Sequence, residues 1–484
     1  MMERPEDPRY APDRPHEECG VVGISLPGAG SGPGSSVEAA RTAFYGLFAL
    51  QHRGQEAAGI ASSDGSTIHL RKDTGLVAQV FREGSIDSLT GPLAIGHTRY
   101  STTGTSSARN AQPFVIDTMH GPLAVAHNGN ITNAAMLRRD LLARGIGLSS
   151  ASDSELLAMN LAGAKGADWP QRIRSAMALW EGAYSLLVLT REAIYALRDP
   201  WGFRPLAVAM LPGEVAAVAS ETSALRILGA ASTREIEPGA IVELSGGAVR
   251  DQLGVSARES SSCSFEFVYF SRPDSEWKGR SVHAARRALG GILARESPVD
   301  ADVVIPVPDS AIPPAIGFAS VSGIPYEEGL VKNRYIARTF IEPTEALRRQ
   351  GVALKFNTLP DAFRGKRVVL VDDSIVRGTT TGPLVAMLRV AGAREIHLRI
   401  ASPPIRHPCF MGVDMGRPEE LVATRHDAAG LARKLGADSL AWLSMEGLRA
   451  AIGTGGLCDA CFTGRYAVDI DEGASKTGFE GGSR

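Results

Sequence analysis

From residue 368 the chain reads Val368-Val369-Leu370-Val371-Asp372-Asp373-Ser374-Ile375-Val376-Arg377-Gly378-Thr379-Thr380-Thr381, and this stretch decides the fold of its second half. The four apolar residues at its start predict a buried strand. Two carboxylates, Asp372 and Asp373, follow at the carboxyl end of that strand. The next residues are small or carry hydroxyls, and apolar residues at helical spacing follow over 382–391. A strand, a polar turn and a helix in this order predict one unit of an α/β sheet.

In open α/β sheets, ligands bind just beyond the carboxyl ends of the strands, where the two carboxylates are expected. The loop after them offers backbone N–H groups and hydroxyls to a phosphate, helped by the N-terminus of the helix. Paired carboxylates beside a phosphate suit ribose hydroxyls and a hydrated Mg²⁺. The chain has no Gly-x-x-x-x-Gly-Lys, so this is not a Walker A loop. The alternative is that the acid pair only solvates the strand end and caps the helix.

The rest of the second half repeats this alternation. Residues 303–308 read as another apolar strand and residues 281–296 as a helix, which favours a parallel sheet covered on both faces. The strand ends in a loop that could hold a diphosphate, with Ser310 able to help ligate Mg²⁺. Cations follow at 332–340, starting with Lys332, and again at Lys355. Out of context, each of these cations reads as part of a solvated surface.

The first half has a different pattern. One helix-like stretch covers 37–52, and short strand-like runs broken by Gly and polar turns follow it. Many short strands with few helices predict a strand-rich sheet layer from residue 19 to about 250. A polar, Ser-rich stretch at 251–262 is the predicted domain boundary. The strand-like runs cover 93–96, 123–126, 185–190, 194–197, 206–210 and 215–219.

Cys19 stands where a segment rich in Pro and charge gives way to the apolar run Val21-Val22-Gly23-Ile24. The eighteen residues before it cannot bury enough surface to offset their ordering entropy, and they lack the apolar centre of a secretory signal. If cleavage made Cys19 the N-terminus, its own α-amine, titrating near pH 8, could accept the thiol proton. The alternative is a small core cysteine beside a ragged start.

Composition excludes several classes of protein. With 484 residues, two or more domains are expected. The net charge of −2 implies no large basic face for nucleic acid, and no apolar stretch approaches the length of a membrane span. The lack of a signal peptide indicates the cytosol. Five cysteines in a reducing compartment suggest chemistry or metal binding rather than disulfides.

The four cysteines other than Cys19 are Cys263, Cys409, Cys458 and Cys461, and only the last two form a Cys-x-x-Cys pair. Scattered core cysteines would be the default reading. Four thiolates are nevertheless the ligand set of a cubane iron–sulfur cluster or of a structural zinc.

The stretch that begins at residue 368 resembles the diphosphate-sugar binding signature of type I phosphoribosyltransferases. The resemblance implies that 5-phosphoribosyl diphosphate (PRPP) binds here, with its ribose on Asp372 and Asp373 and its 5-phosphate in the loop at 374–381. The cationic segment from Lys332, and Lys355, are similar to one family within that class, the glutamine PRPP amidotransferases. The residues implied to contact PRPP are Asp372, Asp373, Ser374, Arg377, Gly378, Thr379, Thr380, Lys332 and Lys355, and those implied to hold Mg²⁺ are Ser310, Asp372 and Asp373.

The first half is similar to the glutaminase half of the same family, the class II glutamine amidotransferases. The resemblance implies that Cys19 attacks the side-chain amide of glutamine with its own α-amine as base. It implies that Asn128 and Gly129 stabilise the tetrahedral oxyanion, that Arg99 pairs with the α-carboxylate, and that Asp153 binds the α-ammonium. Without the resemblance, Asn-Gly is first a turn signal and Asp153 could cap the following helix. The matching blocks start at Cys19 and cover 51–60, 96–102, 127–131 and 152–155.

The sequence around Cys409 and around the Cys458–Cys461 pair resembles the branch of the family that carries a [4Fe–4S] cluster and a cleaved propeptide. The resemblance implies that Cys263, Cys409, Cys458 and Cys461 hold the cluster. It also implies feedback inhibition by purine nucleotides and a homotetramer.

The predicted protein is therefore an enzyme that makes 5-phosphoribosylamine from glutamine and PRPP, with ammonia passing internally between two sites. Two other functions remain as alternatives, a PRPP-sensing regulator and a different class II amidotransferase, such as one making glucosamine phosphate. The predicted parts are a propeptide at 1–18, an N-terminal-nucleophile αββα glutaminase at 19–255, an α/β phosphoribosyltransferase with a parallel sheet at 256–466, and a disordered tail at 467–484.

Overall fold

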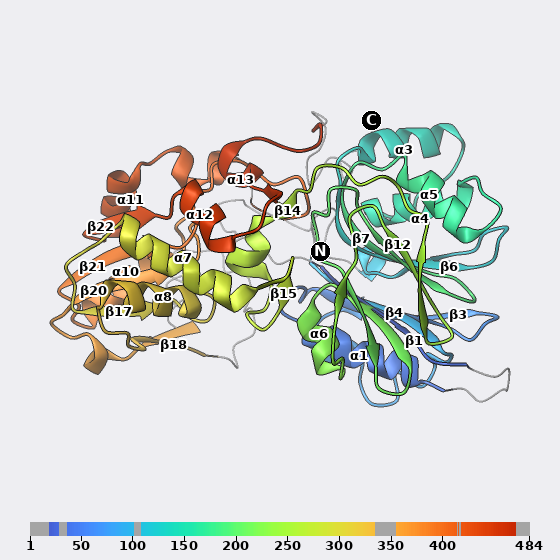
Figure 1. Ribbon diagram of the computed structural model, residues 1–484, viewed down its shortest axis with the longest axis horizontal. Helices are drawn as coiled ribbons and strands as arrows, with labels where there is room; N and C mark the ends of the chain where they lie inside the picture. The colour runs from blue at the N-terminus through green and yellow to red at the C-terminus, as the bar shows by residue number, and fades with distance from the viewer. Residues whose placement is uncertain are drawn as a thin grey trace, which may run out of the picture.

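The computed structural model describes residues 19–28, 36–100, 108–333, 355–413, 415 and 418–470. The predicted propeptide, most of the cationic segment and most of the predicted tail lie outside these residues. Two bodies lie side by side, one built on two stacked sheets and the other on a parallel sheet (Figure 1). No helix within these ranges is long and apolar enough to cross a membrane.

The first body has four layers, because helices cover the outer faces of two stacked antiparallel sheets (Figure 1). Apolar side chains such as Val21, Leu187 and Val218 fill the space between the sheets. This arrangement confirms the predicted αββα fold. The seven-stranded sheet runs β11 (Arg234–Glu235), β9 (Ala207–Leu211), β10 (Val215–Ala219), β1 (Gly20–Ser25), β4 (Leu93–Arg99), β2 (Ala57–Ser63), β3 (Ile68–Thr74). The six-stranded sheet runs β13 (Ala248–Gln252), β12 (Ile241–Ser245), β8 (Ile194–Arg198), β7 (Gly182–Leu189), β6 (Leu123–Ile131), β5 (Phe114–Ile116). The helices are α1 (Glu38–Ala49), α2 (Val77–Val80) and α6 (Thr222–Ile227) by the first sheet, and α3 (Ala134–Ala143), α4 (Asp153–Gly163) and α5 (Trp169–Met177) by the second.

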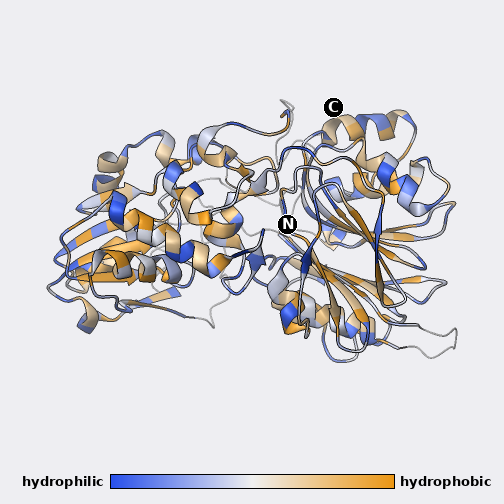
Figure 2. Cartoon of the chain, in the orientation of Figure 1, coloured by the Kyte–Doolittle hydropathy of each residue, from blue (hydrophilic) through white to orange (hydrophobic). Residues whose placement is uncertain are grey.

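The second body is an α/β unit with a four-stranded parallel sheet, as predicted. Its strands are rich in hydrophobic residues (Figure 2), and Val368 to Val371 are fully buried. The sheet runs β17 (Val303–Pro306), β20 (Arg367–Asp372), β21 (Glu395–Ile400), β22 (Ser439–Trp442). The helices are α7 (Val282–Glu296), α8 (Ile312–Ser322), α10 (Thr381–Val390), α11 (Ala428–Leu435), α12 (Met445–Ile452) and α13 (Ala460–Thr463). Short strand pairs are β14 (Ser262–Cys263) with β23 (Leu457–Cys458), β15 (Glu276–Trp277) with β16 (Arg280–Ser281), and β18 (Leu330–Lys332) with β19 (Phe356–Thr358).

Two expectations about local structure differ from the fold. The first half was expected to hold few helices, yet α3, α4 and α5 form a full outer layer. In α4 the apolar residues are interrupted by buried polar ones, such as Glu155, which accepts hydrogen bonds from the backbone and hydroxyls of Ser149 and Ser150. The tail was expected from residue 467, but Val468 is 9% exposed and packs beside Met411.

A buried ionic cluster joins the two bodies. The guanidinium of Arg53 donates to Glu221 from the first body at 2.7 Å, and to Glu266 from the start of the second at 2.7 and 3.0 Å. All three side chains are at most 2% exposed. Arg286 on α7 extends the cluster by donating to the carbonyls of Phe267 and Ser271. Since each charge has partners, the cluster ties the two cores together at a fixed geometry.

We expect Glu266→Gln to lower the free energy of unfolding by about 2–3 kcal/mol, since the buried Arg53 loses its counter-charge and part of its hydrogen bonding. Glu276→Gln is the matched control, because Glu276 pairs with Arg226 where both side chains are roughly half exposed. That change should cost less than about 0.5 kcal/mol. Chemical denaturation followed by tryptophan fluorescence measures both. Equal stability of the two variants would contradict a structural role for the cluster.

Candidate functional sites

Five of the predicted glutaminase residues meet at the ends of β1, β4, β6 and α4. Cys19, Arg99, Gly129 and Asp153 line one cavity, and Asn128 precedes Gly129 on β6. Cys19 and Arg99 are brought together because β1 pairs with β4. The sequence places these residues far apart, and only strand pairing unites them.

Cys19 presents a buried thiol. Its side chain is 6% exposed, and its Sγ contacts the carbonyl of Tyr100 at 3.4 Å. Burial raises the pKa of this thiol to about 11, against smaller lowering effects from Tyr100 and Arg99. At neutral pH the group is therefore protonated, and it needs a nearby base before it can act as a nucleophile.

Asn128 and Gly129 occupy consecutive positions on β6, and Gly129 lines the cavity. The side-chain nitrogen of Asn128 is buried and has no hydrogen-bond partner within the described residues, and the residue is 1% exposed. Gly129 has φ +145°, and a β-carbon there would lie 2.0 Å from the carbonyl oxygen of Ala183. Only glycine fits at this position. An unsatisfied buried amide costs free energy, so it is the signature expected of a donor kept ready for substrate.

Buried polar groups hold the backbone before Asn128. The carbonyl of His127 accepts a hydrogen bond from His97 Nε2 at 3.0 Å, and its N–H donates to Gln112 at 2.8 Å. The ring of His127 faces Ser154 Oγ at 3.3 Å and the Ala183 carbonyl at 3.4 Å. Burial lowers the pKa values of both histidines, that of His97 to about 3. Because both ring nitrogens of His127 have partners, this histidine is better suited to holding the strand than to activating Cys19.

Asp153 lies at the start of α4 but does not cap it. The N-cap is Ser152, whose side chain accepts from the N–H of Ser154. The carboxylate of Asp153 is 4% exposed and accepts from the N–H of Ile131 at 3.2 Å. The simpler reading of Asp153 as a helix cap is therefore wrong, and its carboxylate is available at the cavity wall.

Sequence reasoning missed Arg53, which supports the nucleophile directly. Arg53 Nε donates to the backbone carbonyl of Cys19 at 3.1 Å, while the rest of its guanidinium makes the cluster that joins the two bodies. Gly54 beside it has no room for a side chain, since a β-carbon would lie 2.6 Å from the backbone of Thr98. Arg53 lies in the matching block at 51–60. Its structural role depends on contact with Glu266, which is far away in the sequence.

The predicted phosphoribosyl site forms at the carboxyl end of β20. Asp372 and Asp373 are 2% and 0% exposed. Asp373 accepts hydrogen bonds from Ser374 Oγ at 2.7 Å and from Ser310 Oγ. Ser310 comes from the loop after β17, so the parallel pairing of β17 with β20 brings the two predicted Mg²⁺-binding segments together. Burial lowers the pKa of Arg286 on α7 to about 10. The nearby carboxylate of Asp373 has a smaller effect in the opposite direction and raises that pKa.

The cations predicted to contact PRPP each have a neighbour in the second body. Lys332 on β18 pairs with Asp309 at 2.8 Å, beside Ser310. Lys355 neighbours β19, with its ammonium 5.8 Å from the ring of Phe356. Arg377 donates to Glu420 at 2.7 Å and is largely buried. The rest of the cationic segment, 334–340, lies outside the described residues.

The loop after Asp373 leads into α10 as the sequence predicted. Gly378 has φ +77°, a conformation that favours glycine, and α10 begins at Thr381 with Thr380 as its N-cap. Ser374 is 2% exposed and Thr381 is 1% exposed, while Thr379 and Thr380 are half-buried. Hydroxyls and backbone donors therefore surround the N-terminus of a ten-residue helix, which suits a phosphate.

The four remaining cysteines come together where the two bodies meet. Cys263 and Cys458 are register partners in β14 and β23, and the N–H groups of Arg406 and His407, just before Cys409, donate to the carbonyl of Cys461 at 3.0 Å. Burial raises the pKa of Cys461, and Cys409, Cys458 and Cys263 add to the rise. Burial likewise raises the pKa of Cys458 to about 12. Scattered core cysteines, the default reading from sequence, would not lie within electrostatic range of one another.

Among the described residues, no group of three or more His, Cys, Asp or Glu is spaced to hold one metal ion. The mutual electrostatic effects of Cys263, Cys409, Cys458 and Cys461 nevertheless show that these four thiols are neighbours.

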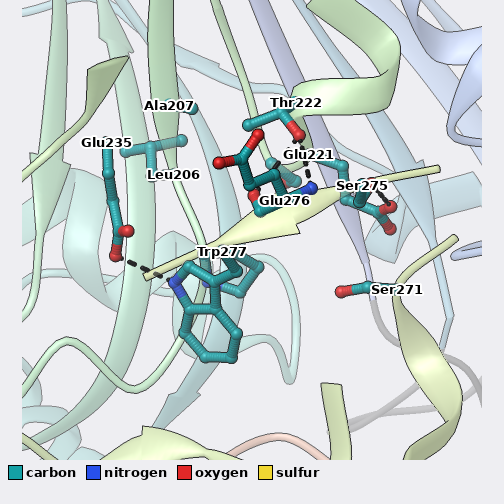
Figure 3. A pocket seen from close by; sticks show the side chains of 11 residues that line it. Leu206, Ala207, Glu221, Thr222, Glu235, Ser271, Ser275, Glu276 and Trp277 are labelled. Atoms are coloured by element: carbon teal, nitrogen blue, oxygen red, sulfur yellow. Dashed lines mark hydrogen bonds between the residues drawn. The ribbon is translucent and has the colours of Figure 1, made fainter. Parts of the chain in front are cut away.

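A second cavity, of about 280 Å³, lies at the junction and contains none of the predicted site residues. Its carboxylates are already paired, as Figure 3 illustrates for Glu235, which accepts from the indole of Trp277 at 2.9 Å. Glu221 in its wall belongs to the Arg53 cluster. The N–H of Glu276 donates to Thr222 at 2.8 Å across the junction (Figure 3). We therefore assign this cavity to the interface between the two bodies and not to a reaction site.

Comparisons with known proteins agree with both halves of this arrangement. Residues 97–227 match the family described as "Glutamine amidotransferase domain". The chain is 48% identical to an amidophosphoribosyltransferase of Synechocystis sp. and 45% identical to that of Bacillus subtilis, with 94–96% of this chain and 94–95% of each relative covered. It is also similar to the solved structure of glutamine PRPP amidotransferase from B. subtilis complexed with ADP and GMP, with a TM-score of 0.87, 44% identity, and coverage of 94% of this chain and 98% of that one.

Proposed function

The chain belongs to the amidophosphoribosyltransferase family, and from this premise we propose how its residues divide the reaction. The enzyme converts glutamine, PRPP and water into 5-phosphoribosylamine, glutamate and diphosphate, the first committed step of purine biosynthesis. The observation that supports this division of labour is that one chain combines two different sites. The first has a buried thiol and an amide donor that has no partner among the described residues, and the second has an acid pair at the end of a parallel strand. Neither alternative weighed from the sequence, a PRPP-sensing regulator or a glucosamine phosphate enzyme, combines these two sites.

At the first site, Cys19 Sγ attacks the side-chain carbonyl carbon of glutamine while its proton passes to the α-amine of Cys19. Asn128 and Gly129 donate to the oxygen that gains charge, while Arg99 and Asp153 hold the α-carboxylate and α-ammonium. The amine then gives the proton to the leaving nitrogen. The C–N bond breaks, ammonia departs, and a γ-glutamyl thioester remains on Cys19. Water hydrolyses the thioester to glutamate and restores the thiol.

At the second site, the ribose hydroxyls of PRPP would rest on Asp372 and Asp373, and its 5-phosphate would accept donors from the loop at 374–380. Lys332 lies beside the loop that would hold the diphosphate, while Lys355 would act near it and Arg377 would orient the phosphate loop. Ammonia attacks C1 of the ribose, the bond from C1 to the diphosphate oxygen breaks, and diphosphate leaves. Ser310, Asp372 and Asp373 are suited to hold Mg²⁺, which when bound would offset charge on the leaving diphosphate.

A direct test of this division is product analysis with two nitrogen sources. Purified enzyme should form phosphoribosylamine from PRPP with either glutamine or ammonia, and no glucosamine phosphate from fructose 6-phosphate. We further propose that ammonia passes within the protein. Glutamate dehydrogenase with its substrates, added to the glutamine reaction, should therefore trap little of the nitrogen, and substantial trapping would contradict internal transfer.

Asn128→Ala should lower kcat for the glutamine reaction by about 10²–10³-fold and leave the KM for glutamine within about twofold, because the lost donor acts mainly in the transition state. Asn160→Ala is the control, since Asn160 is also buried but donates only to the carbonyl of Leu156 on its own helix. Steady-state glutaminase kinetics measure both. A large rise in KM without a fall in kcat would assign Asn128 to glutamine binding instead.

We propose that residues 1–18, which lie outside the described residues, are a propeptide whose removal frees the α-amine of Cys19. The support is the raised thiol pKa of about 11, which leaves the thiol without reactivity at neutral pH unless a base is supplied. Starting the chain at Cys19 should make its alkylation by iodoacetamide rise with pH through about pH 8, as the α-amine loses its proton. The chain that keeps residues 1–18 should react only as the pH approaches 11. Identical profiles, followed by intact mass, would contradict the amine as base.

We also propose that Cys263, Cys409, Cys458 and Cys461 hold a [4Fe–4S] cluster. Its support is that Cys263 and Cys458 are register partners and that Cys409, Cys458 and Cys263 all lie near enough to Cys461 to raise its pKa. The cluster, when bound, would supply four iron–thiolate bonds that hold the segments bearing these cysteines together. Protein purified without oxygen should carry about four irons per chain and absorb broadly in the visible. Cys458→Ser should lose both, whereas stoichiometric zinc would overturn the assignment.

The assembly and regulation of the enzyme are proposed from its relatives. A solved relative binds ADP and GMP, so purine nucleotides are the expected feedback inhibitors here. The homotetramer is likewise a proposal, testable by light scattering. A cytoplasmic location is also proposed, since five cysteines without disulfides are typical of proteins from a reducing compartment.

A further inference from the structure

A short segment of the second body, residues 409–412, lies directly against the strand that carries the glutaminase donors. The carbonyl of Phe410 accepts a hydrogen bond from Asn130 Nδ2 at 2.9 Å. Asn130 follows Gly129 on β6, so the bond holds the residue next to the predicted oxyanion donor. It joins positions 280 residues apart in the sequence.

Within this segment, Gly412 lies against the backbone of Gly129 on β6. A β-carbon at Gly412 would lie 2.9 Å from the carbonyl carbon of Gly129 and 3.1 Å from its Cα. Gly412 has φ +101° and Gly129 has φ +145°, so two glycine backbones meet with no side chain between them. Backbone atoms cannot turn aside as a flexible side chain can. A displacement of Gly412 is therefore passed to Gly129.

Met411, between these two contacts, is anchored from the first body. Its carbonyl accepts from Arg204 Nε at 3.0 Å and also from Arg204 Nη2. Arg204 is fully buried, and its guanidinium also lies 3.8 Å from Glu266 in the cluster that joins the bodies. The Met411 side chain is 3% exposed and packs with Ala183. Ala183 is the register partner of Asn130 across β6 and β7.

We propose that Phe410, Met411 and Gly412 are positioning residues of the glutaminase site, holding the backbone of Gly129 in place from the second body. The N–H of Gly129 points at the developing oxyanion only while residues 409–412 are docked. The inference rests on the proposed roles of Cys19, Asn128 and Gly129, and adds that their geometry is completed by the phosphoribosyltransferase half. Cys409 begins this segment. An interaction that holds Cys409 beside Cys458 and Cys461 therefore also restrains Gly412, three residues further along.

Gly412→Ala is the main test, with Gly392→Ala as its matched control. Gly392 has a similar φ of +105°, but a β-carbon there would lie 3.0 Å from the flexible side chain of Arg364 and 3.9 Å from the nearest backbone atom, so the change adds the same backbone strain without contacting β6. Gly412→Ala should lower kcat for glutamine hydrolysis by about 10–100-fold, since small misplacements of a catalytic group have effects of that size. The KM for glutamine and the inhibition constant of glutamate should change less than about twofold, because Arg99 and Asp153 are untouched.

A second readout isolates the oxyanion donors from ammonia transfer. The diazoketone 6-diazo-5-oxo-L-norleucine alkylates a thiol: the S–C bond forms at its diazo carbon, that carbon gains the thiol proton, and N₂ leaves. Its ketone oxygen occupies the oxyanion position during the reaction. Intact mass should show that Gly412→Ala slows the limiting rate of alkylation of Cys19 by about tenfold or more, with little change in the half-saturating concentration. Gly392→Ala should react as the unchanged enzyme does.

Asn130→Ser covers the case in which Gly412→Ala does not fold. It removes the bond to Phe410 and adds no bulk, so a milder fall of about 3–10-fold in the alkylation rate is expected, with ammonia-dependent activity retained as the check on folding. If folded Gly412→Ala and Asn130→Ser both keep the unchanged kcat and alkylation rate, the proposal is overturned. If the unchanged enzyme is not alkylated at Cys19, the proposed nucleophile fails instead, which is a distinguishable result.

Discussion

Cys19→Ala is expected to remove glutamine-dependent phosphoribosylamine formation, by about 10⁴-fold or more, while ammonia-dependent formation stays within about twofold. The physical reason is that no thioester can form without the sulfur, and Asn128 and Gly129 then have no oxyanion to stabilise. The second site is untouched, because Cys19 lies on the first body and the acid pair on the second.

The measurement is product formation with each nitrogen source on chains that begin at residue 19, so that processing does not enter. Cys19→Ser is a useful companion, since it keeps the shape but not the acidity of the thiol. Loss of both activities in a folded Cys19→Ala protein would mean that the two sites are not separable, and the division of labour would be wrong.

Asp372→Asn is expected to weaken both activities together, by about 100-fold or more, because glutamine and ammonia share one acceptor, PRPP. Asp372 is 2% exposed at the end of β20, next to Asp373, which Ser310 and Ser374 contact. Replacing one carboxylate removes a ribose acceptor and half of the charge available to Mg²⁺.

Asp300→Asn is the control for this change, since Asp300 precedes β17 at the amino end of the parallel strands, whereas Asp372 lies at their carboxyl end, and its side chain is 86% exposed. That variant should keep both activities. Parallel assays with glutamine and ammonia, with the KM for PRPP measured in each, decide the matter. A fall confined to the glutamine reaction would remove Asp372 from the phosphoribosyl site.

Several local elements were readable from the chain because their signals are short-range. The strand at 368–371, the helix at 382–391 and the helix at 281–296 appear as β20, α10 and α7 within one or two residues. The strand-like run at 215–219 coincides with β10. Apolar runs bounded by turn residues carry this information in the sequence itself.

The helices α3 and α5 were not anticipated, and α4 was indicated only by Asp153 as a candidate cap, since buried polar residues interrupt the apolar pattern of α4. Glu155 is 2% exposed, yet it is satisfied by Ser149 and Ser150 from the preceding turn. Such compensation exists only once the turn and the helix are both folded, so a pattern of hydrophobicity along the chain does not reveal it.

The sequence by itself determined the chemistry proposed for the enzyme: the proposed nucleophile Cys19, the proposed donors Asn128 and Gly129, the acid pair and the four further cysteines are all recognisable as residue types in a local pattern. Only the tertiary structure decided how these pieces depend on each other. Arg53 touches Cys19 and Glu266 at once, and Gly412 lies against Gly129. The contacts between the two bodies join positions about 210 to 280 residues apart, and their geometry is set by packing and buried charge pairing, which act between surfaces and leave no local trace in the sequence.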